Sequence, residues 1–437
     1  MNVNTSSVGR TAVRAHFIDF VQDPANAGSI TLRDLPDGVM LIEYGRIHSI
    51  GPYAEFKTEF ETANVRHDYQ GQWVLPGFVD SHAHYVQTDI IASPSGSLLD
   101  WLNTYTFKAE RQFADPEHAK TVADAFVRLL LRNGTTSASV FASVHAASCD
   151  AIFEAAQAAG MRLNAGKVLM DQNAPADLRD TAEQGIEESL ALISHWHGRD
   201  RLRYSVTPRF VPTSSRAQLQ LAGELYQSQS DLHLQSHVAE NEAEVAWVKQ
   251  LHPNARSYLQ VYEDHGLLGP RTTYAHGIWL DDADRACMAN THTSLAFCPT
   301  SNLFLGSGLF DLDKAHQNNI TVGLATDVGG GDSFSMLGTM REAYKVCQLK
   351  GQSVSVETLY YLATAGAAKA LGLEDFIGDF SVGKEADFVV YDKQSTELLA
   401  RRIANCRSLP EQLFVMMMLG DDRAIARVHL MGRPMYL

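Results

Sequence analysis

Cysteine and long apolar runs are both scarce in this sequence. An odd, scattered set of cysteines without a C-x-x-C pair argues against a disulfide framework and is typical of reduced, intracellular proteins. No run approaches the roughly 18 apolar residues of a membrane helix, and the first residues lack the apolar core of a secretion signal. We therefore expect a soluble, cytoplasmic protein that does not enter a membrane. The five cysteines are Cys149, Cys287, Cys298, Cys347 and Cys406.

Positive charge is also in short supply. The chain has 36 Lys and Arg against 51 Asp and Glu, which gives a net charge of −15. This balance disfavours nucleic acid or an anionic membrane as the main partner, but not a small, nearly neutral substrate. Hydrophobic residues make up 45% of the 437 residues, enough for a sizeable core. The length fits one large barrel with a lesser domain.

From about residue 72, short apolar runs alternate with segments of helical period. One such segment, 119–134, places Val122, Phe126, Leu129 and Leu130 on one stripe. Near-continuous apolar runs are typical of strands that are buried on both faces. Eight of them predict a (β/α)8 TIM-like barrel over residues 72–375. They are WVLPGFVDSHAH, TTSASVFASV, RLNAGKVLMD, LRYSVTPRFV, LHLQSHVAE, TTYAHG, TSLAFCPTSN and ITVGLATDVG.

The two flanks of this region have β character. Residues 38–51 predict a hairpin with Gly45 in its turn. Near the other end, the segments ADFVVYD and ARVHLMGRPMYL show a similar pattern. We expect residues 1–71 and 376–437 to pair into one small β-sandwich domain beside the barrel.

Histidines stand at the end of the first barrel strand. His82 and His84 are two residues apart on a strand, so they face the same way and can reach one ion. Barrel active sites are built at this end of the strands, which favours a metal site over two core histidines. A second H-x-H, His195 and His197, ends an amphipathic helix. Histidines there suit the helix dipole and are usually exposed, so we expect a structural pair.

Three further strands end in side chains of the same kind. His237 ends the fifth run with Glu240 three residues on, His276 ends the sixth, and Asp327 ends the eighth. Each alone could be a core histidine or a helix cap, but those explanations do not account for four strands at one rim. Three imidazoles and one carboxylate suit Zn²⁺, which makes hydroxide available at neutral pH. Glu240 and Asp327 are the candidates for proton transfer.

These motifs resemble the amidohydrolase superfamily, in the segment PGFVDSHAH and in the His, His and Asp of the fifth, sixth and eighth strands. Within it, nearly the whole chain is similar to the guanine deaminase family, most specifically in PRFVPTSS and CPTSNLFLGSGLF and also in LLDWLNTYTFKAER. The resemblance implies that Glu240 is the proton shuttle, that His276 contacts the nucleophile or the substrate, and that the protein is a homodimer. It implies one Zn²⁺ per chain, held by His82, His84, His237 and Asp327.

The same resemblance implies that guanine is hydrolysed at C2 to xanthine and ammonia. Asp327 would take the proton of the attacking water, and Glu240 would pass a proton to the ring and then to the leaving ammonia. Arginine is the preferred fork for the adjacent acceptors O6 and N7, glutamine can read an amide edge, and phenylalanine can pack on the ring. Five side chains are placed around the purine: Gln87, Arg209, Phe210, His237 and His276.

The sequence departs from the family pattern at two positions. Val86 and Lys108 stand where family members often have Pro, which bears on the loops around Gln87 and so on substrate affinity. Binuclear members carry a metal-bridging Lys at the end of the fourth strand. Here that strand ends in Pro208 and Arg209, so we expect one metal, and a structural role for Lys167 in the third strand.

Three alternatives to a zinc-dependent guanine deaminase differ in what the sequence says of them. The cytidine-deaminase type of zinc site requires H-x-E with P-C-x-x-C, and neither motif occurs. A deaminase or chlorohydrolase acting on another purine, a pyrimidine or a triazine stays open, because pockets change easily on one fold. A non-catalytic scaffold on the same fold is disfavoured, since all four expected ligands and Glu240 are present.

Overall fold

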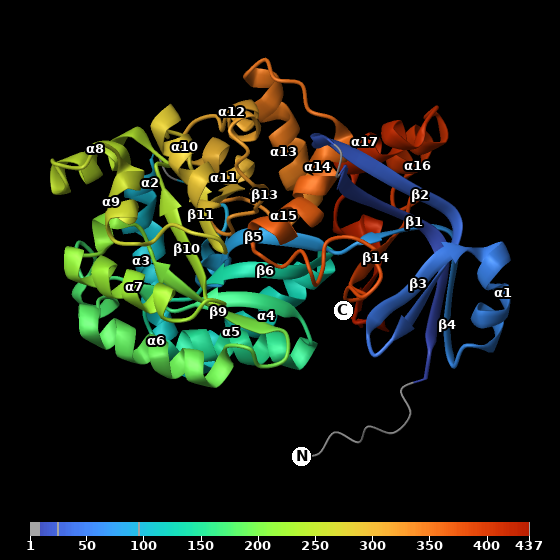
Figure 1. Cartoon of the computed structure of the whole chain (residues 1–437), viewed down its shortest axis with the longest axis horizontal. Helices are drawn as coiled ribbons and strands as arrows, with labels where there is room; N and C mark the ends of the chain where they lie inside the picture. The colour runs from blue at the N-terminus through green and yellow to red at the C-terminus, as the bar shows by residue number, and fades with distance from the viewer. Residues whose placement is uncertain (1–8, 24–25, 95–96, 437) are drawn as a thin grey trace.

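The molecule has two parts that lie side by side (Figure 1). The computed structural model describes residues 9–23, 26–94 and 97–436. The larger part is a barrel of parallel strands with helices around it, and the smaller part is a sheet built from both ends of the chain. None of the described helices is long and apolar enough to cross a membrane.

Eight parallel strands follow one another around the barrel in chain order, and each falls within one of the eight apolar runs. Every residue of the first two strands is buried, as expected where helices cover the outer face. The predicted (β/α)8 barrel is therefore confirmed. Its strands are β5 (Phe78–His84), β6 (Thr135–Phe141), β7 (Arg162–Gly166), β9 (Leu202–Pro208), β10 (His233–Val238), β11 (Thr272–His276), β12 (Ser294–Phe297) and β13 (Val322–Leu324), and the short β8 (Val168–Leu169) pairs with β9.

Backbone hydrogen bonds bring the first and last strands together. The N–H of Asp327 donates to the carbonyl of His82 at 3.0 Å, and the N–H of His84 donates to the carbonyl of Val328 at 2.5 Å. The side chain of Asp80 on β5 adds a second link, because it accepts the N–H of Thr326 at 3.0 Å. This nearly closed seam sets the chain after β13 directly against the end of β5.

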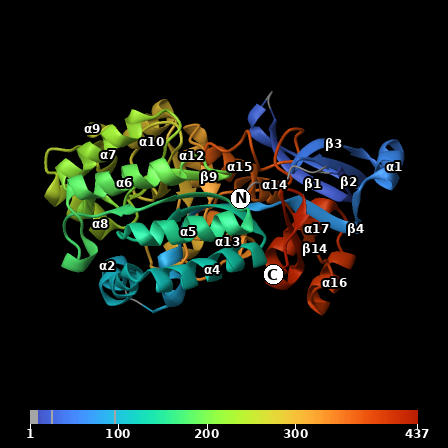
Figure 2. The same cartoon turned by 90° about the horizontal axis from the view of Figure 1, so that it is seen from below.

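Helices cover the outside of the barrel (Figures 1 and 2). The first long one begins after Asp115, whose side chain accepts the N–H of Glu117. It buries Val122, Phe126 and Leu130 of the predicted stripe, whereas Leu129 is only partly buried. The helices are α4 (Pro116–Arg132), α5 (Ala146–Ala159), α6 (Ala182–Trp196), α7 (Arg216–Ser228), α8 (Glu242–Leu251), α9 (Tyr258–Asp264), α10 (Asp282–Thr291), α11 (Pro299–Phe304), α12 (Leu312–Gln317), α13 (Met336–Leu349), α14 (Val356–Leu362) and α15 (Ala365–Ala370).

The smaller part holds a seven-stranded sheet in the order β16-β15-β14-β4-β1-β2-β3. Both ends of the chain meet where β14 pairs antiparallel with β4, which confirms the second sheet expected from the two flanks. The predicted hairpin is present, with Tyr44 and Gly45 at φ 52° and 77° in its turn. The strands are β1 (Thr11–Asp23), β2 (Asn26–Glu43), β3 (Arg46–Pro52), β4 (Val65–Pro76), β14 (Phe388–Tyr391), β15 (Ile425–Leu430) and β16 (Arg433–Pro434).

Helices also occur in the flanks, where the sequence pattern indicated only strands. They are α1 (Tyr53–Thr62), α16 (Glu397–Ala404) and α17 (Leu409–Leu419). Helix α17 carries the methionine-rich run of the chain and buries Met416 and Met417 completely. Unbranched methionine fills irregular gaps. Burial of these side chains therefore stabilises the helix between the strands.

Buried ion pairs join the two parts at the N-terminal ends of the barrel strands. Arg162 opens β7 and donates from Nε to Oε2 of Glu385 at 2.9 Å. Arg201 stands just before β9 and donates from Nη2 to the same oxygen at 2.7 Å. These contacts lie at the end of the barrel opposite to His82 and His84.

Candidate metal centre and active site

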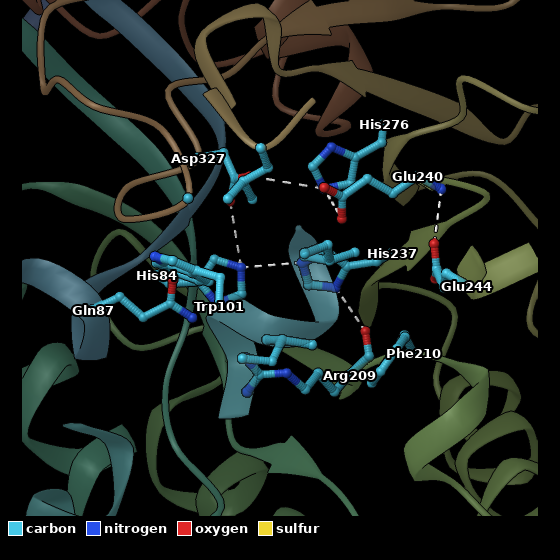
Figure 3. A pocket seen from close by; sticks show the side chains of 14 residues that line it. His84, Gln87, Trp101, Arg209, Phe210, His237, Glu240, Glu244, His276 and Asp327 are labelled. Carbon is cyan, nitrogen blue, oxygen red and sulfur yellow. Dashed lines mark hydrogen bonds and ion pairs between the residues drawn. The ribbon is translucent and has the colours of Figure 1, made fainter. Parts of the chain in front are cut away.

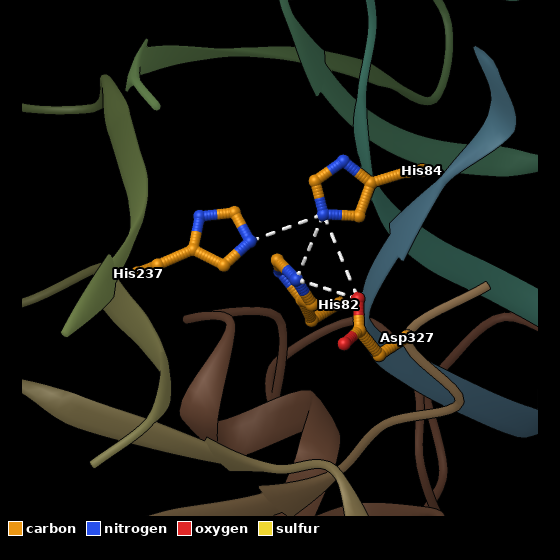
Figure 4. A group of neighbouring side chains, drawn as sticks. All are labelled: His82, His84, His237 and Asp327. Carbon is orange, nitrogen blue, oxygen red and sulfur yellow. Dashed lines mark hydrogen bonds and ion pairs between the residues drawn. The ribbon is translucent and has the colours of Figure 1, made fainter. Parts of the chain in front are cut away.

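Four predicted metal ligands converge at the C-terminal end of the barrel (Figure 4). His82 and His84 end β5, His237 lies near the end of β10, and Asp327 follows β13. One ligand atom from each lies within 4.8 Å of all the others. His82 and Asp327 are 245 positions apart in the sequence. The barrel nevertheless brings these four residues together, because the C-terminal ends of its strands share one rim.

The spacing of the donor atoms suits a single ion. Nε2 of His84 lies 3.2 Å from Nε2 of His82 and 3.1 Å from Nε2 of His237. Oδ1 of Asp327 lies 3.2 Å from Nε2 of His82 and 3.6 Å from Nε2 of His84. Donors about 2.0–2.1 Å from a tetrahedral zinc are separated by about 3.3 Å. The residues present therefore fit a zinc ion.

The protonation states of these side chains suit metal binding. Burial lowers the pKa of His82, His84 and His237, so their imidazoles are neutral at physiological pH. Burial opposes ionisation of Asp327, but the hydrogen bond with His82 and the positive charge of His276 outweigh it and hold its pKa well below the usual range. Neutral imidazoles and an ionised carboxylate are the forms that bind divalent metals.

Glu240 and His276 lie beside this group. Glu240 follows β10, and its Oε1 accepts a hydrogen bond from Oγ of Ser307 at 2.9 Å. Its Oε2 lies 3.3 Å from Nε2 of His276, which is 3.8 Å from Oδ2 of Asp327. Burial raises the pKa of Glu240 to about 7. A carboxyl group with that pKa can both take up and release a proton near neutral pH.

His276 stands between two carboxylates and is outside the group of four ligands. Its Nδ1 lies 2.9 Å from Oδ1 of Asn302. Burial lowers its pKa, but the charges of Glu240 and Asp327 outweigh this effect and raise it. Cys298, which the sequence reasoning did not single out, forms a second possible ligand group with His276 and Asp327.

Three of the four candidate ligands, His84, His237 and Asp327, line a pocket (Figure 3). Gln87 lies on the short helix η1 (Tyr85–Ile90), and Arg209 and Phe210 directly follow β9. All three line the pocket, as the sequence predicted for residues around a bound base, and each is at most 5% exposed. The complete lining is His84, Gln87, Leu98, Trp101, Leu102, Arg209, Phe210, His237, Glu240, Glu244, His276, Leu305, Asp327 and Gly330.

Sequence reasoning missed Glu110 and Trp101. Glu110 is fully buried and accepts hydrogen bonds from Arg209 and Gln87, so Arg209 is held by an interior ion pair rather than by one on the surface. Trp101 lines the pocket, and its buried indole N–H has no hydrogen-bond partner among the residues that the structure describes. Trp101 ends α2 (Leu98–Trp101) and Glu110 ends α3 (Phe107–Glu110), with η2 (Leu102–Thr106) between these two helices. The sequence offered one indication of Glu110, because it is an acidic residue on the apolar side of the helical segment 98–110.

The histidines expected to be structural lie away from the rim. His195 is exposed at the end of α6, and Nδ1 of His197 accepts the backbone N–H of Tyr204 at 3.1 Å. Neither belongs to a possible metal group among the described residues. Lys167 is fully buried and pairs with Asp180 and, at 3.3 Å, with Glu188. These contacts agree with a structural role for all three residues.

The two departures from the family pattern differ in their surroundings. Val86 is buried on η1 next to Gln87, whereas Lys108 is exposed on α3. A change at Val86 therefore has a direct route to the Gln87 side chain. Lys108 acts on the pocket only through the backbone of its helix.

Comparison with known proteins places the chain among related sequences and structures. The model of the amidohydrolase family matches residues 73–435. Guanine deaminase of Escherichia coli (strain K12) is 47% identical over 428 residues, which cover 97% of each chain. The solved structure of E. coli guanine deaminase matches with a TM-score of 0.94 at 46% identity, over 98% of this chain and 99% of that one.

Guanine deaminase from C. acetobutylicum, solved with guanine bound in its active site, matches with a TM-score of 0.87. It is 27% identical and aligns over 98% of this chain and 100% of its own. The family match, the identity over nearly the full length and the shared fold all agree. The chain therefore belongs to the amidohydrolase family and, within it, to the guanine deaminases.

Proposed function

We propose that this protein hydrolyses guanine at C2 to give xanthine and ammonia. The observation that carries the proposal is the group of three histidines and one aspartate, of which His84, His237 and Asp327 line a pocket that Arg209 also lines. The first feature supports hydrolysis, and the second supports recognition of a base with acceptors along one edge. Membership of the guanine deaminases supports the choice of guanine.

The metal that we propose is one zinc ion per chain, with His82, His84, His237 and Asp327 as its ligands. The support is the donor set, the separations of 3.1–3.6 Å between four pairs of its donor atoms, and the neutral state of the imidazoles. Zinc supplies Lewis acidity, which makes hydroxide available at neutral pH. Metal analysis of the purified protein distinguishes zinc from iron.

The side chains of the protein move the protons. Asp327 accepts a proton from the attacking water, whose oxygen bonds to C2 of guanine. Glu240 gives its proton to the ring nitrogen, takes up the remaining proton of the new hydroxyl group at C2 and passes it to the amino group. The bond from C2 to that group breaks and C2=O forms as ammonia leaves. Asp327 then returns its proton to Glu240, which restores both side chains. His276, 3.3 Å from Glu240, contacts the nucleophile or the substrate. Overall, guanine and water give xanthine and ammonia.

Three side chains of the pocket read the base. Arg209 donates to O6 and N7, Phe210 packs on the ring, and Gln87 reads the amide edge. His237 and His276 border the same space. Arg209 directly follows β9 on the rim that carries His237, so a planar base can lie over the ligands and still reach it.

A substrate screen tests the proposal. Metal-loaded protein is mixed with guanine, adenine, cytosine or 8-oxoguanine, and each reaction is followed by ultraviolet absorbance. We expect guanine to be converted to xanthine. Turnover of a different base without guanine turnover would support another deaminase or chlorohydrolase. No turnover of any base by protein with bound metal would support a scaffold.

Assembly and location stay predictions. The resemblance to dimeric relatives supports a homodimer, which light scattering of the purified protein tests. A cytoplasmic location rests on the sequence pattern alone and is tested by cell fractionation.

A further inference from the structure

Glu110 lies behind the pocket and holds both polar side chains that we propose to read the base. Its Oε1 accepts from Nε2 of Gln87 at 3.1 Å and from Nη1 of Arg209 at 2.9 Å. Its Oε2 accepts from the same Nη1 at 2.7 Å. We infer that Glu110 is a positioning residue that sets specificity for a purine with an oxygen at C6, acting through Arg209 and Gln87. The inference rests on the proposed function.

Glu110 uses only one nitrogen of the guanidinium. Both of its oxygens bind Nη1 of Arg209, while Nε and Nη2 of Arg209 make no hydrogen bond within the described part of the chain. Those two nitrogens form one edge of the guanidinium, and two N–H groups on one edge match two adjacent acceptors. The carboxylate therefore neutralises the buried arginine and leaves a complete fork for O6 and N7.

A second contact with the guanidinium comes from the same helical turn. The guanidinium carbon of Arg209 lies 5.8 Å from the centre of the Phe107 ring. Phe107 and Glu110 are three residues apart on α3, so they share one face of the helix. The carboxylate binds one nitrogen of Arg209, and the ring lies at the outer distance of a cation–π contact.

Glu110 also fixes the orientation of the Gln87 amide. Nε2 of Gln87 donates to Glu110, and Oε1 accepts the backbone N–H of Gly329 at 3.2 Å. A reversed amide would set Oε1 against the carboxylate and Nε2 against an N–H group, so it is disfavoured. One N–H and one lone pair of Gln87 remain for a ligand. In Glu110→Gln only the N–H of Gly329 still selects the orientation of the Gln87 amide, so the preference is weakened.

Binding of two inhibitors measures recognition of O6 without requiring turnover. Hypoxanthine has O6 and lacks the amino group, and unsubstituted purine lacks both. We expect wild-type protein to bind hypoxanthine at least about tenfold more tightly than purine, the scale of a bidentate contact. In Glu110→Gln this ratio falls by about tenfold, while the metal content stays at the wild-type level.

A matched control separates positioning from folding. Glu385→Gln also removes a buried carboxylate that pairs with arginine, but at the opposite end of the barrel. It should lower the melting temperature and leave the hypoxanthine-to-purine ratio unchanged. Equal weakening of both ligands in Glu110→Gln would assign Glu110 to the fold alone and overturn the inference, as would an unchanged ratio.

Two further variants keep the inference testable. If Glu110→Gln does not fold, Glu110→Asp takes its place, since it keeps the charge but shortens the side chain by one methylene. Its hypoxanthine-to-purine affinity ratio should also fall. An unchanged ratio overturns the inference. The double variant Glu110→Gln with Arg209→Lys should show the ratio of Arg209→Lys alone, since coupled residues are not additive. Additive losses would show that Glu110 does not act through Arg209. A wild-type protein that deaminates guanine but shows no preference for hypoxanthine overturns the inference alone, whereas one that does not deaminate guanine overturns the proposed function.

Discussion

The backbone carbonyl of Arg209 accepts a 2.7 Å hydrogen bond from Nδ1 of His237. This bond fixes the tautomer of His237, so that the lone pair of Nε2 points toward the other candidate ligands. One residue thus orients a candidate metal ligand with its backbone and faces the pocket with its side chain. The position of a bound base is thereby tied to the position of the metal.

Removal of a metal ligand should remove the metal. Replacing His82, His84, His237 or Asp327 with Ala deletes one donor of a four-donor set, so we expect most of the metal to be lost. His276→Ala should keep much of its metal and turn over poorly, because His276 lies outside the set. Inductively coupled plasma mass spectrometry of the purified variants gives the metal content per chain.

His195 in the last turn of α6 and His197 directly after it provide the control for this experiment. His195→Ala and His197→Ala should retain full metal content, since neither side chain lies at the rim. Metal loss in His276→Ala equal to that in the four ligand variants would make His276 a full ligand. Metal loss in the His195 or His197 variant would point to a different site.

Replacement of the proton shuttle should separate chemistry from metal binding. Glu240→Gln keeps the shape of the side chain and can still accept from Ser307, but it cannot carry a proton. We expect kcat to fall by at least about 100-fold, the usual scale of general acid–base catalysis, with metal content unchanged. Steady-state kinetics and metal analysis on one preparation check this. Near-normal kcat with bound metal would exclude Glu240 from this role.

Arg209→Lys should not behave as a conservative change. Lysine presents a point charge rather than a fork, so a bidentate contact worth about 1–3 kcal/mol is lost. The kcat/KM for guanine should fall by roughly 5- to 150-fold, since each 1.36 kcal/mol is tenfold. Adenine has no acceptor at C6, and any residual activity on it should hardly change. Unchanged kinetics on guanine would remove Arg209 from base recognition.

Much of the barrel and the rim follows from local sequence patterns. Apolar runs mark the strands, and the residues that end them, such as His84 and His237, must meet because the ends of parallel strands share one edge. Glu110 could not be assigned in this way. Its partners Gln87 and Arg209 lie 23 and 99 positions away, and no periodicity in the chain relates them. Helix α17 was missed for a similar reason, since its burial depends on tertiary packing.

Loss of Glu385 should destabilise the junction of the two parts of the molecule. Glu385→Ala leaves Arg162 and Arg201 buried without this carboxylate, and breaking a buried pair in this way costs about 3–5 kcal/mol. Denaturant unfolding of the variant and the wild type measures the difference. A stability equal to that of the wild type would contradict this expectation; Asp387 pairs with Arg201 but not with Arg162 among the described residues.

The most direct test is the reaction itself, carried out in water labelled with oxygen-18. Metal-loaded protein is incubated with guanine, the purine products are analysed by mass spectrometry, and ammonia is quantified separately. Hydrolytic deamination at C2 predicts xanthine that carries one labelled oxygen, together with one ammonia for each guanine consumed. Absence of xanthine, or xanthine without the label, from protein that contains its metal would contradict the proposed function.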